Sequence, residues 1–259
     1  MTPASQDRIT TLGRVFFALG IVGLGGQHIF NAEFIAVIVA SFPTWMPGRY
    51  FWICVAGTGL MVTGISMLLG KGARASGLVL GVALLAALVL LQIPEQARHF
   101  VSIGIATNAF KELTLAGGAF IVAASANRAK PAPGDGFLVA FGCFALGLTC
   151  AVFGADHFEY RDFVATLVPS WMPGHIFWTY FAGAALVAAG LGMVFRVLPR
   201  LASALLGGMI FIWFLVLHIP RALADPYGGN GNEWTSVFEA LAFSGIAFML
   251  VGMLPNKKR

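Results

Sequence analysis

The chain has 259 residues, of which 58% are hydrophobic and 10% are charged, and its mean hydropathy is +0.84. A water-soluble protein of this length needs a charged shell, and too few charges are present to form one. The formal net charge of +5 comes from basic residues that flank apolar segments. It therefore indicates membrane topology and not a nucleic-acid partner.

Eight apolar segments follow one another along the chain, each near the roughly 20 residues that cross a bilayer. In lipid the backbone must satisfy its own hydrogen bonds, and no segment alternates polar and apolar residues, so we expect helices. The predicted spans are approximately 12–29, 49–69, 75–93, 108–125, 136–155, 175–195, 200–219 and 234–254. The predicted fold is an all-α, polytopic membrane protein with eight transmembrane helices in a lipid bilayer.

Two connections between spans carry similar apolar segments. Residues 33–43 read EFIAVIVASFP and residues 162–169 read DFVATLVP. Both are too short to span a bilayer and too apolar for a free loop. We expect each to be a short helix that lies in the outer interface of the membrane.

Each of these segments leads into an unusual motif, PTWMPGRYFW at 43–52 and PSWMPGHIFW at 169–178. The motif predicts a folded corner, with Trp45 and Trp171 at the depth of the lipid headgroups. Pro47 and Pro173 are expected to open the next helix near its first turn.

The motif belongs to a longer internal repeat. A shift of 126 residues aligns the glycines of the second and third spans with those of the sixth and seventh, and places Gln92 on His218. With small gaps, His28 aligns with His157 and Glu112 with Glu239. Because each unit has an even number of spans, both units insert the same way up. The predicted domains are a four-helix bundle at 1–127, a cytoplasmic linker at 128–135 and a second bundle at 136–259.

Small residues recur on the faces where the helices are expected to meet. They are Gly57, Gly64, Gly77 and Gly81 in the first unit, with Gly183, Gly190, Ser203 and Gly207 in the equivalent places. Such residues let helix backbones approach closely in lipid.

The basic residues predict the orientation of the chain. Most of them fall on one side of an eight-span arrangement, namely Arg8, Arg14, Lys71, Arg74, Arg128, Lys130, Arg196, Arg200, Lys257, Lys258 and Arg259. By the positive-inside rule, both termini are cytoplasmic.

Polar residues at membrane depth define the candidate site, because they are costly there. The first unit contributes His28, Gln92 and Glu112, which are expected to face one another, and Lys111 is expected to form an ion pair beside Glu112. Two interpretations stay open: an outward-facing binding pocket, or a set of interhelical hydrogen bonds that clamps the bundle.

The second unit contributes His157, His218 and Glu239 to the same pattern. With two histidines it is the unit better suited to proton exchange near neutral pH. No catalytic role is assigned to any of these residues.

Metal and haem are not expected. His28 and His157 are mates in the repeat, and imidazole suits iron, copper and zinc. Each lies near the outer interface, however, and Gln92 breaks a set of four histidines. The three cysteines show no CxxC spacing and are interpreted as small buried hydrophobes.

The segment NAFKELTLAGGAFIVAAS at 108–125, the HIPR at 218–221 and the Pro-Gly corners resemble DoxX-like bacterial membrane proteins. The resemblance covers nearly the whole chain twice, whereas many members have a single four-span unit. It implies a bacterial inner-membrane protein. Some DoxX-type proteins are named for subunits of a thiosulfate:quinone oxidoreductase. It thus implies an accessory subunit that anchors a quinone-linked oxidoreductase, with oxidoreductase partner subunits and quinone as the candidate cofactor. The alternative is a protein that binds or transports a lipid or small hydrophobic ligand, with a polar outward-facing pocket in each bundle.

Overall fold

The structure is a computed structural model that describes residues 1–40, 42–43, 45–98, 103–126, 128 and 130–255. Within these ranges the chain forms helices and connecting turns, with no β-strand. The elements are α1 (Pro3–Phe30), α2 (Arg49–Leu69), α3 (Ala73–Ala87), η1 (Leu88–Gln92), α4 (Ile93–Arg98), α5 (Ile103–Ser125), α6 (Asp135–Glu159), α7 (Arg161–Leu167), α8 (His175–Val194), α9 (Pro199–Trp213), η2 (Phe214–His218), α10 (Ile219–Ala224), η3 (Gly228–Gly231) and α11 (Asn232–Met253). All-helical architecture is therefore confirmed for the part of the chain that the structure describes.

Seven helices among the described residues are long and apolar enough to cross a membrane. Two of them are composite, because α3, η1 and α4 run on as one helix, as do α9, η2 and α10. Each of the eight predicted segments is helical. However, α5, which contains the segment predicted at 108–125, is not among the seven. The eighth span therefore stays a prediction.

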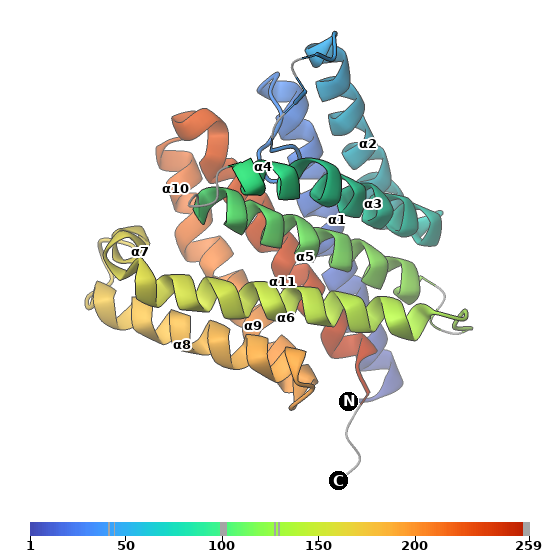
Figure 1. The fold of residues 1–259 in the computed structure, drawn as a ribbon. Coiled ribbons are helices and arrows are strands. Elements are labelled where there is room, and N and C mark those ends of the chain that lie inside the picture. Colours follow the sequence, from blue (N-terminus) through green and yellow to red (C-terminus); the bar gives the residue numbers. More distant parts are fainter. Residues whose placement is uncertain (41, 44, 99–102, 127, 129, 256–259) are drawn as a thin grey trace.

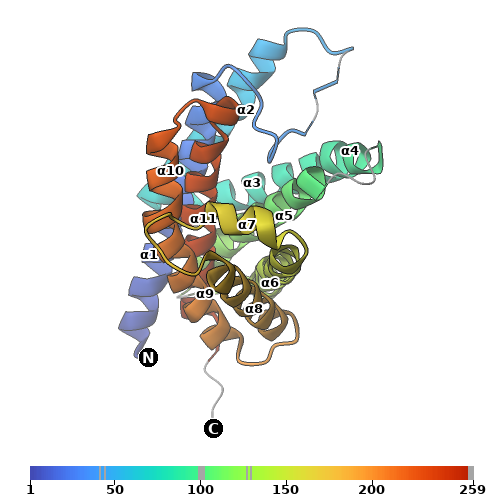
Figure 2. The same ribbon diagram turned by 90° about the vertical axis from the view of Figure 1, so that its left-hand side faces the viewer.

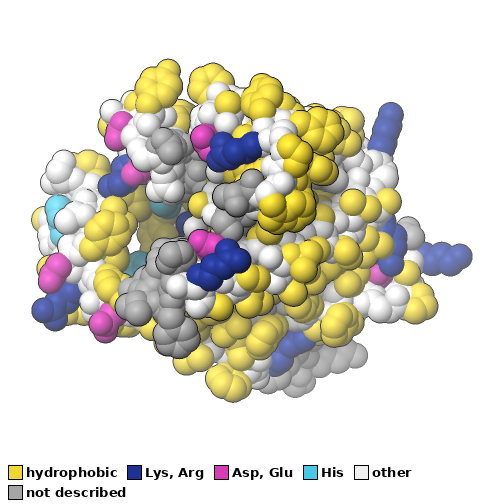
Figure 3. Space-filling view, turned by 45° about the horizontal axis from the view of Figure 1, so that its top comes forward, with side chains coloured by type: hydrophobic (Ala, Val, Ile, Leu, Met, Phe, Trp, Pro, Cys, Tyr) yellow, Lys and Arg dark blue, Asp and Glu magenta, His cyan; other side chains and the backbone are white. Residues whose placement is uncertain are grey.

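The outer faces of the long helices are apolar. On the composite helix that begins with α3, Val79, Val82, Val89 and Leu90 are all exposed. Figure 3 shows hydrophobic side chains covering large connected areas of one face. Soluble proteins rarely expose such areas, whereas lipid accommodates them, so the surface fits a multi-pass membrane protein.

The helices pack in a closed circuit that joins the two halves of the sequence. Along it, α1 packs on α2, α2 on α3, α3 on α5, α5 on α6, α6 on α8, α8 on α9, α9 on α11, and α11 on α1. In addition, α5 and α11 pack on each other. Within an apolar stretch of 18 residues in α11, 72% of the residues are buried inside the protein. Both ends of the described chain lie at the bottom of Figures 1 and 2, away from α4, α7 and α10. The pairs α5 with α6 and α1 with α11 each join residues from the two sides of the predicted boundary at 128–135, so contacts between the two predicted units are part of the fold.

Glycines bring the neighbouring helices into close contact. A Cβ atom at Gly25 of α1 would lie 2.6 Å from the carbonyl oxygen of Gly57 on α2. In the second half, a Cβ at Gly154 of α6 would lie 2.7 Å from the carbonyl oxygen of Gly183 on α8. The prediction that small residues mark helix contacts is confirmed at these positions.

Two helical turns have π geometry, and both end at a residue of the candidate site. Gln92 ends η1 and His218 ends η2, and each is followed by Ile-Pro. Proline has no N–H, so Pro94 cannot donate to the carbonyl of Leu90 inside η1. Single π turns of this kind occur frequently at functional sites.

The two apolar connections differ from each other. Residues 162–169 contain the short helix α7, as predicted, with Phe163 exposed on it. The described residues of 33–43 form turns and no helix, so the prediction was wrong for this copy. There Ile35, Val37 and Ile38 are buried in the core, which means that the segment folds into the protein.

The two Trp-Met-Pro-Gly corners have the same geometry. The N–H of Met46 donates to the carbonyl of Pro43 at 3.1 Å, and that of Met172 donates to Pro169 at 2.9 Å. Each helix begins directly after a glycine with positive φ, 74° at Gly48 and 75° at its counterpart Gly174. Pro47 and Pro173 each lie two residues before the first residue of the next helix, which is near its first turn, as predicted.

Candidate functional site

Four of the six predicted polar residues are buried inside the protein. The side chains of His28, Gln92 and Glu112 are fully buried, and Glu239 is 5% exposed. An ionised carboxylate that faces lipid would cost several kcal/mol, and neither glutamate does so.

His28 fixes the chain that follows α1, called here the first connection (residues 31–40), to α1. Its Nδ1 lies 2.8 Å from the carbonyl oxygen of Leu24, and its Nε2 accepts the N–H of Ile35 at 3.4 Å. Since the Ile35 N–H needs an acceptor, the ring proton is on Nδ1 and donates to Leu24. His28 is thus a neutral ring with both nitrogens occupied.

Gln92, at the end of η1, also holds the first connection in place. Its Nε2 donates to the carbonyl oxygens of Ala36 at 2.7 Å and Val37 at 3.2 Å. His28 and Gln92 therefore clamp the turn at 35–37, and neither is bonded to Glu112. The predicted set of Glu112, His28 and Gln92 as mutual partners was wrong, because the backbone of the connection takes their hydrogen bonds.

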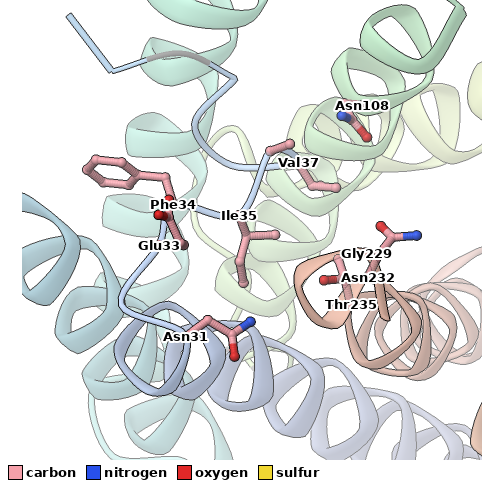
Figure 4. Close-up of a pocket in the computed structure, with 10 residues that line it drawn as sticks. Asn31, Glu33, Phe34, Ile35, Val37, Asn108, Gly229, Asn232 and Thr235 are labelled. Carbon is pink, nitrogen blue, oxygen red and sulfur yellow. The ribbon is translucent and has the colours of Figure 1, made fainter. Parts of the chain in front are cut away.

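A pocket lies beside this clamped turn, between the first connection, α5 and α11 (Figure 4). It has a volume of about 180 Å³. Its lining comprises Asn31, Glu33, Phe34, Ile35, Ala36 and Val37 on the first connection, Asn108 on α5, Gly229 on η3, and Asn232 and Thr235 at the start of α11. The two halves of the sequence thus form it together.

Gln27 fixes the opposite wall of the pocket. Its Nε2 donates to the carbonyl of Gly231 at 2.6 Å, and its Oε1 accepts the hydroxyl of Thr235 at 3.1 Å. The sequence analysis missed this residue. The signal available was an amide next to His28 in an otherwise apolar span.

An ion pair links α5 to α11 one turn below the pocket lining. Nζ of Lys111 lies 2.9 Å from Oε2 of Glu239, whose side chain is nearly buried. The predicted ion pair between Lys111 and its neighbour Glu112 was wrong, because adjacent residues on a helix point in different directions. Lys111 instead crosses to the other half of the sequence.

Glu112 itself has no hydrogen-bond partner among the described residues. Both of its carboxyl oxygens are buried, as is the unbonded Oε1 of Gln92. An unpartnered buried carboxylate is costly enough that such groups bind a proton or a cation instead.

The two histidines of the second half are half-buried and have other neighbours. Nδ1 of His157 lies 2.7 Å from the carbonyl oxygen of Phe153, and its ring stacks on Trp213 with centroids 6.4 Å apart. His218 lies close enough to Glu233, Lys111 and Arg221 to interact with their charges. Glu239 itself pairs with Lys111 through Oε2, and its buried Oε1 has no hydrogen-bond partner, so neither histidine is hydrogen-bonded to it.

The rim of the pocket carries an ion pair between Glu33 and Arg49, each about half exposed. The hydrogen bond from Arg49 lowers the pKa of Glu33 below its ordinary value. The pair is therefore present at neutral pH and is lost as the pH falls through that lowered pKa. Solvent screening keeps its contribution to stability small.

In the described part of the chain, no three His, Cys, Asp or Glu side chains gather closely enough to hold a metal ion. Cys143 and Cys150 are buried and Cys54 is half-buried, all as free thiols.

Comparisons of this chain with models of protein families, with characterised proteins and with solved structures found no match. The resemblance to DoxX-like proteins therefore stays a prediction. What the fold itself defines is an all-helical, multi-pass membrane protein with a polar pocket enclosed by both halves of its sequence.

Proposed function

We propose that this membrane protein binds the polar end of a small amphipathic molecule in the pocket between the first connection, α5 and α11. The observation that carries the proposal is the way the pocket is built. Its walls are fixed by three buried polar side chains, His28, Gln92 and Gln27, each bonded to a lining residue or to its immediate neighbour. Such fixed walls reduce the entropy lost when a ligand binds.

The lining indicates the chemistry of the ligand. Asn31, Asn108, Asn232 and Thr235 offer amide and hydroxyl groups, and the apolar wall includes Phe34. The volume of about 180 Å³ is below the roughly 300–1,000 Å³ of sites that enclose drug-sized ligands. The pocket therefore suits a hydrogen-bonding headgroup whose apolar remainder stays in lipid.

A mass-spectrometric inventory of small molecules retained by the purified protein tests this function. Asn108→Leu removes one hydrogen-bonding group from the lining, and we expect it to lower retention of the bound molecule at least tenfold. The control is Thr63→Val, since Thr63 is half-buried on α2, does not line the pocket and bonds to its own helix. If both variants and the parent protein retain the same molecules equally, the pocket is not the binding site.

The inventory also separates the two functional classes. The pocket is the observation that favours ligand binding over an accessory role in a quinone-linked oxidoreductase system. Recovery of a quinone together with oxidoreductase subunits would favour the accessory role and the DoxX-like resemblance.

We also propose that the chain lies in a bacterial inner membrane as two parallel four-span units, with eight spans and both termini cytoplasmic. The basic residues at one set of helix ends support this orientation. Support for the repeat comes from equivalent features in the two halves, which are the glycine contacts of α1 with α2 and α6 with α8, and the π turns η1 and η2.

Labelling of single cysteines tests the orientation. In a variant without the native cysteines, we expect Ser170→Cys and Tyr227→Cys, both at exposed positions, to react with an impermeant thiol reagent from the periplasm. Lys71→Cys on the opposite side should react only after the cells are lysed. The reverse pattern would place the termini outside.

A further inference from the structure

Five buried side-chain oxygen atoms of the described residues have no donor, namely both carboxyl oxygens of Glu112 and Oε1 of Gln92, Gln96 and Glu239. Glu239 is paired with Lys111 through its other oxygen, so Glu112 is the buried carboxyl group of this set with no partner on either oxygen. A buried acceptor left without a partner costs about 1–3 kcal/mol, and a charged one costs more. These atoms therefore require a positive charge or a hydrogen-bond donor beside them.

The position of Glu112 on α5 places it against α3 and η1. Ala119 and Ala123 lie against Gly77 of α3, and Glu112 lies two turns before Ala119 on the same helical face. Further along the chain, α3 continues into η1, on which α5 also packs. Asn108, which lines the pocket, lies one turn nearer to the pocket on α5.

We propose that Glu112 is a proton-binding site in the interior of the protein. A metal ion or an organic cation needs space and several ligands, and the carboxyl oxygens are closed off from even a water-sized sphere. A proton needs no space. When it is bound, the carboxyl group is neutral and its O–H becomes a donor in a region that otherwise offers acceptors.

Charged and titratable groups on the elements around Glu112 have partners of their own. On α3, Arg74 pairs with Asp135 of α6. On α1, His28 uses both ring nitrogens. Lys111 of α5 pairs with Glu239 of α11, and on α4 Arg98 pairs with Glu95 at 3.4 Å. Glu112 therefore titrates without a fixed counter-ion. This differs from the expectation that the second half carries proton exchange, because Lys111 neutralises the equivalent Glu239.

Infrared difference spectroscopy of the full-length protein in lipid nanodiscs tests the proposal. At neutral pH a protonated carboxyl group gives a C=O band that shifts in D₂O, whereas ionised carboxylates absorb elsewhere. We expect this band in the parent protein and in Glu33→Gln, and its loss in Glu112→Gln. Glu112→Asp should move the band without removing it, which shows that the loss in Glu112→Gln is not caused by misfolding.

Two results would overturn the proposal. One is a parent protein without the band at neutral pH. The other is a shift of the melting temperature by sodium or by ethylammonium chloride that Glu112→Gln abolishes, which would assign the carboxylate to a cation. Neither measurement needs the ligand of the pocket, so failure of the proposed ligand binding would leave this inference standing.

Discussion

Replacement of Lys111 by Met is expected to destabilise the folded protein by about 3 kcal/mol. The variant leaves the nearly buried carboxylate of Glu239 without its cation, and breaking a buried ion pair by removing one partner typically costs about 3–5 kcal/mol. The lower end applies because the side chain of Lys111 is 23% exposed. Denaturant unfolding of the detergent-solubilised protein, followed by circular dichroism, measures the loss.

The double variant Lys111→Met with Glu239→Leu is the matched control. Replacing both partners by apolar groups is often neutral, because no charge is then left buried. We expect the double variant to recover most of the stability that the single variant loses. Equal loss in both variants would mean that Lys111 contributes through packing and not through its charge.

A second large effect is expected at the contact between α1 and α2. The change Gly25→Ala places a methyl group 2.6 Å from the carbonyl oxygen of Gly57, where the neighbouring atom is backbone and cannot move aside. Overpacking of this kind costs about 1–3 kcal/mol. We expect a lower melting temperature and a larger loss of folded protein on extraction from the membrane.

The next residue provides the control. A Cβ at Gly26 meets nothing within 4 Å, so Gly26→Ala should be neutral, or stabilising by up to about 1 kcal/mol through helix propensity. Gly154→Ala, at the equivalent contact of α6 with α8, should reproduce the effect of Gly25→Ala. If Gly25→Ala and Gly26→Ala behave alike, α1 and α2 do not approach each other as closely as described.

Features that depend on local sequence were predictable. The helical segments follow from runs of apolar residues, and the predicted span at 49–69 coincides with α2. The corner before it follows from the chemistry of Pro-Gly, since only glycine readily adopts the positive φ found at Gly48. Burial of Glu112 and Glu239 follows from the cost of exposing a charge to lipid.

Features that depend on partners distant in the sequence were not predictable. Periodicity shows which face of a helix is buried but not which helix covers it, so the pair of Lys111 with Glu239 was missed. The turn at 35–37 was expected to be helical because its residues are apolar. His28 and Gln92 hold its backbone in another conformation, and the bond from Gln92, which lies far along the chain, leaves no local pattern in the sequence.

The closed circuit of helices has a consequence for how the protein is made. A ribosome completes α1 long before α11, yet these two helices lie side by side, and a Cβ at Gly245 would be 2.5 Å from the carbonyl oxygen of Gly13. Until α11 enters the bilayer, this side of α1 must remain covered by lipid or by a chaperone. The pocket, which needs Thr235 of α11, can therefore form only after α11 has been synthesised.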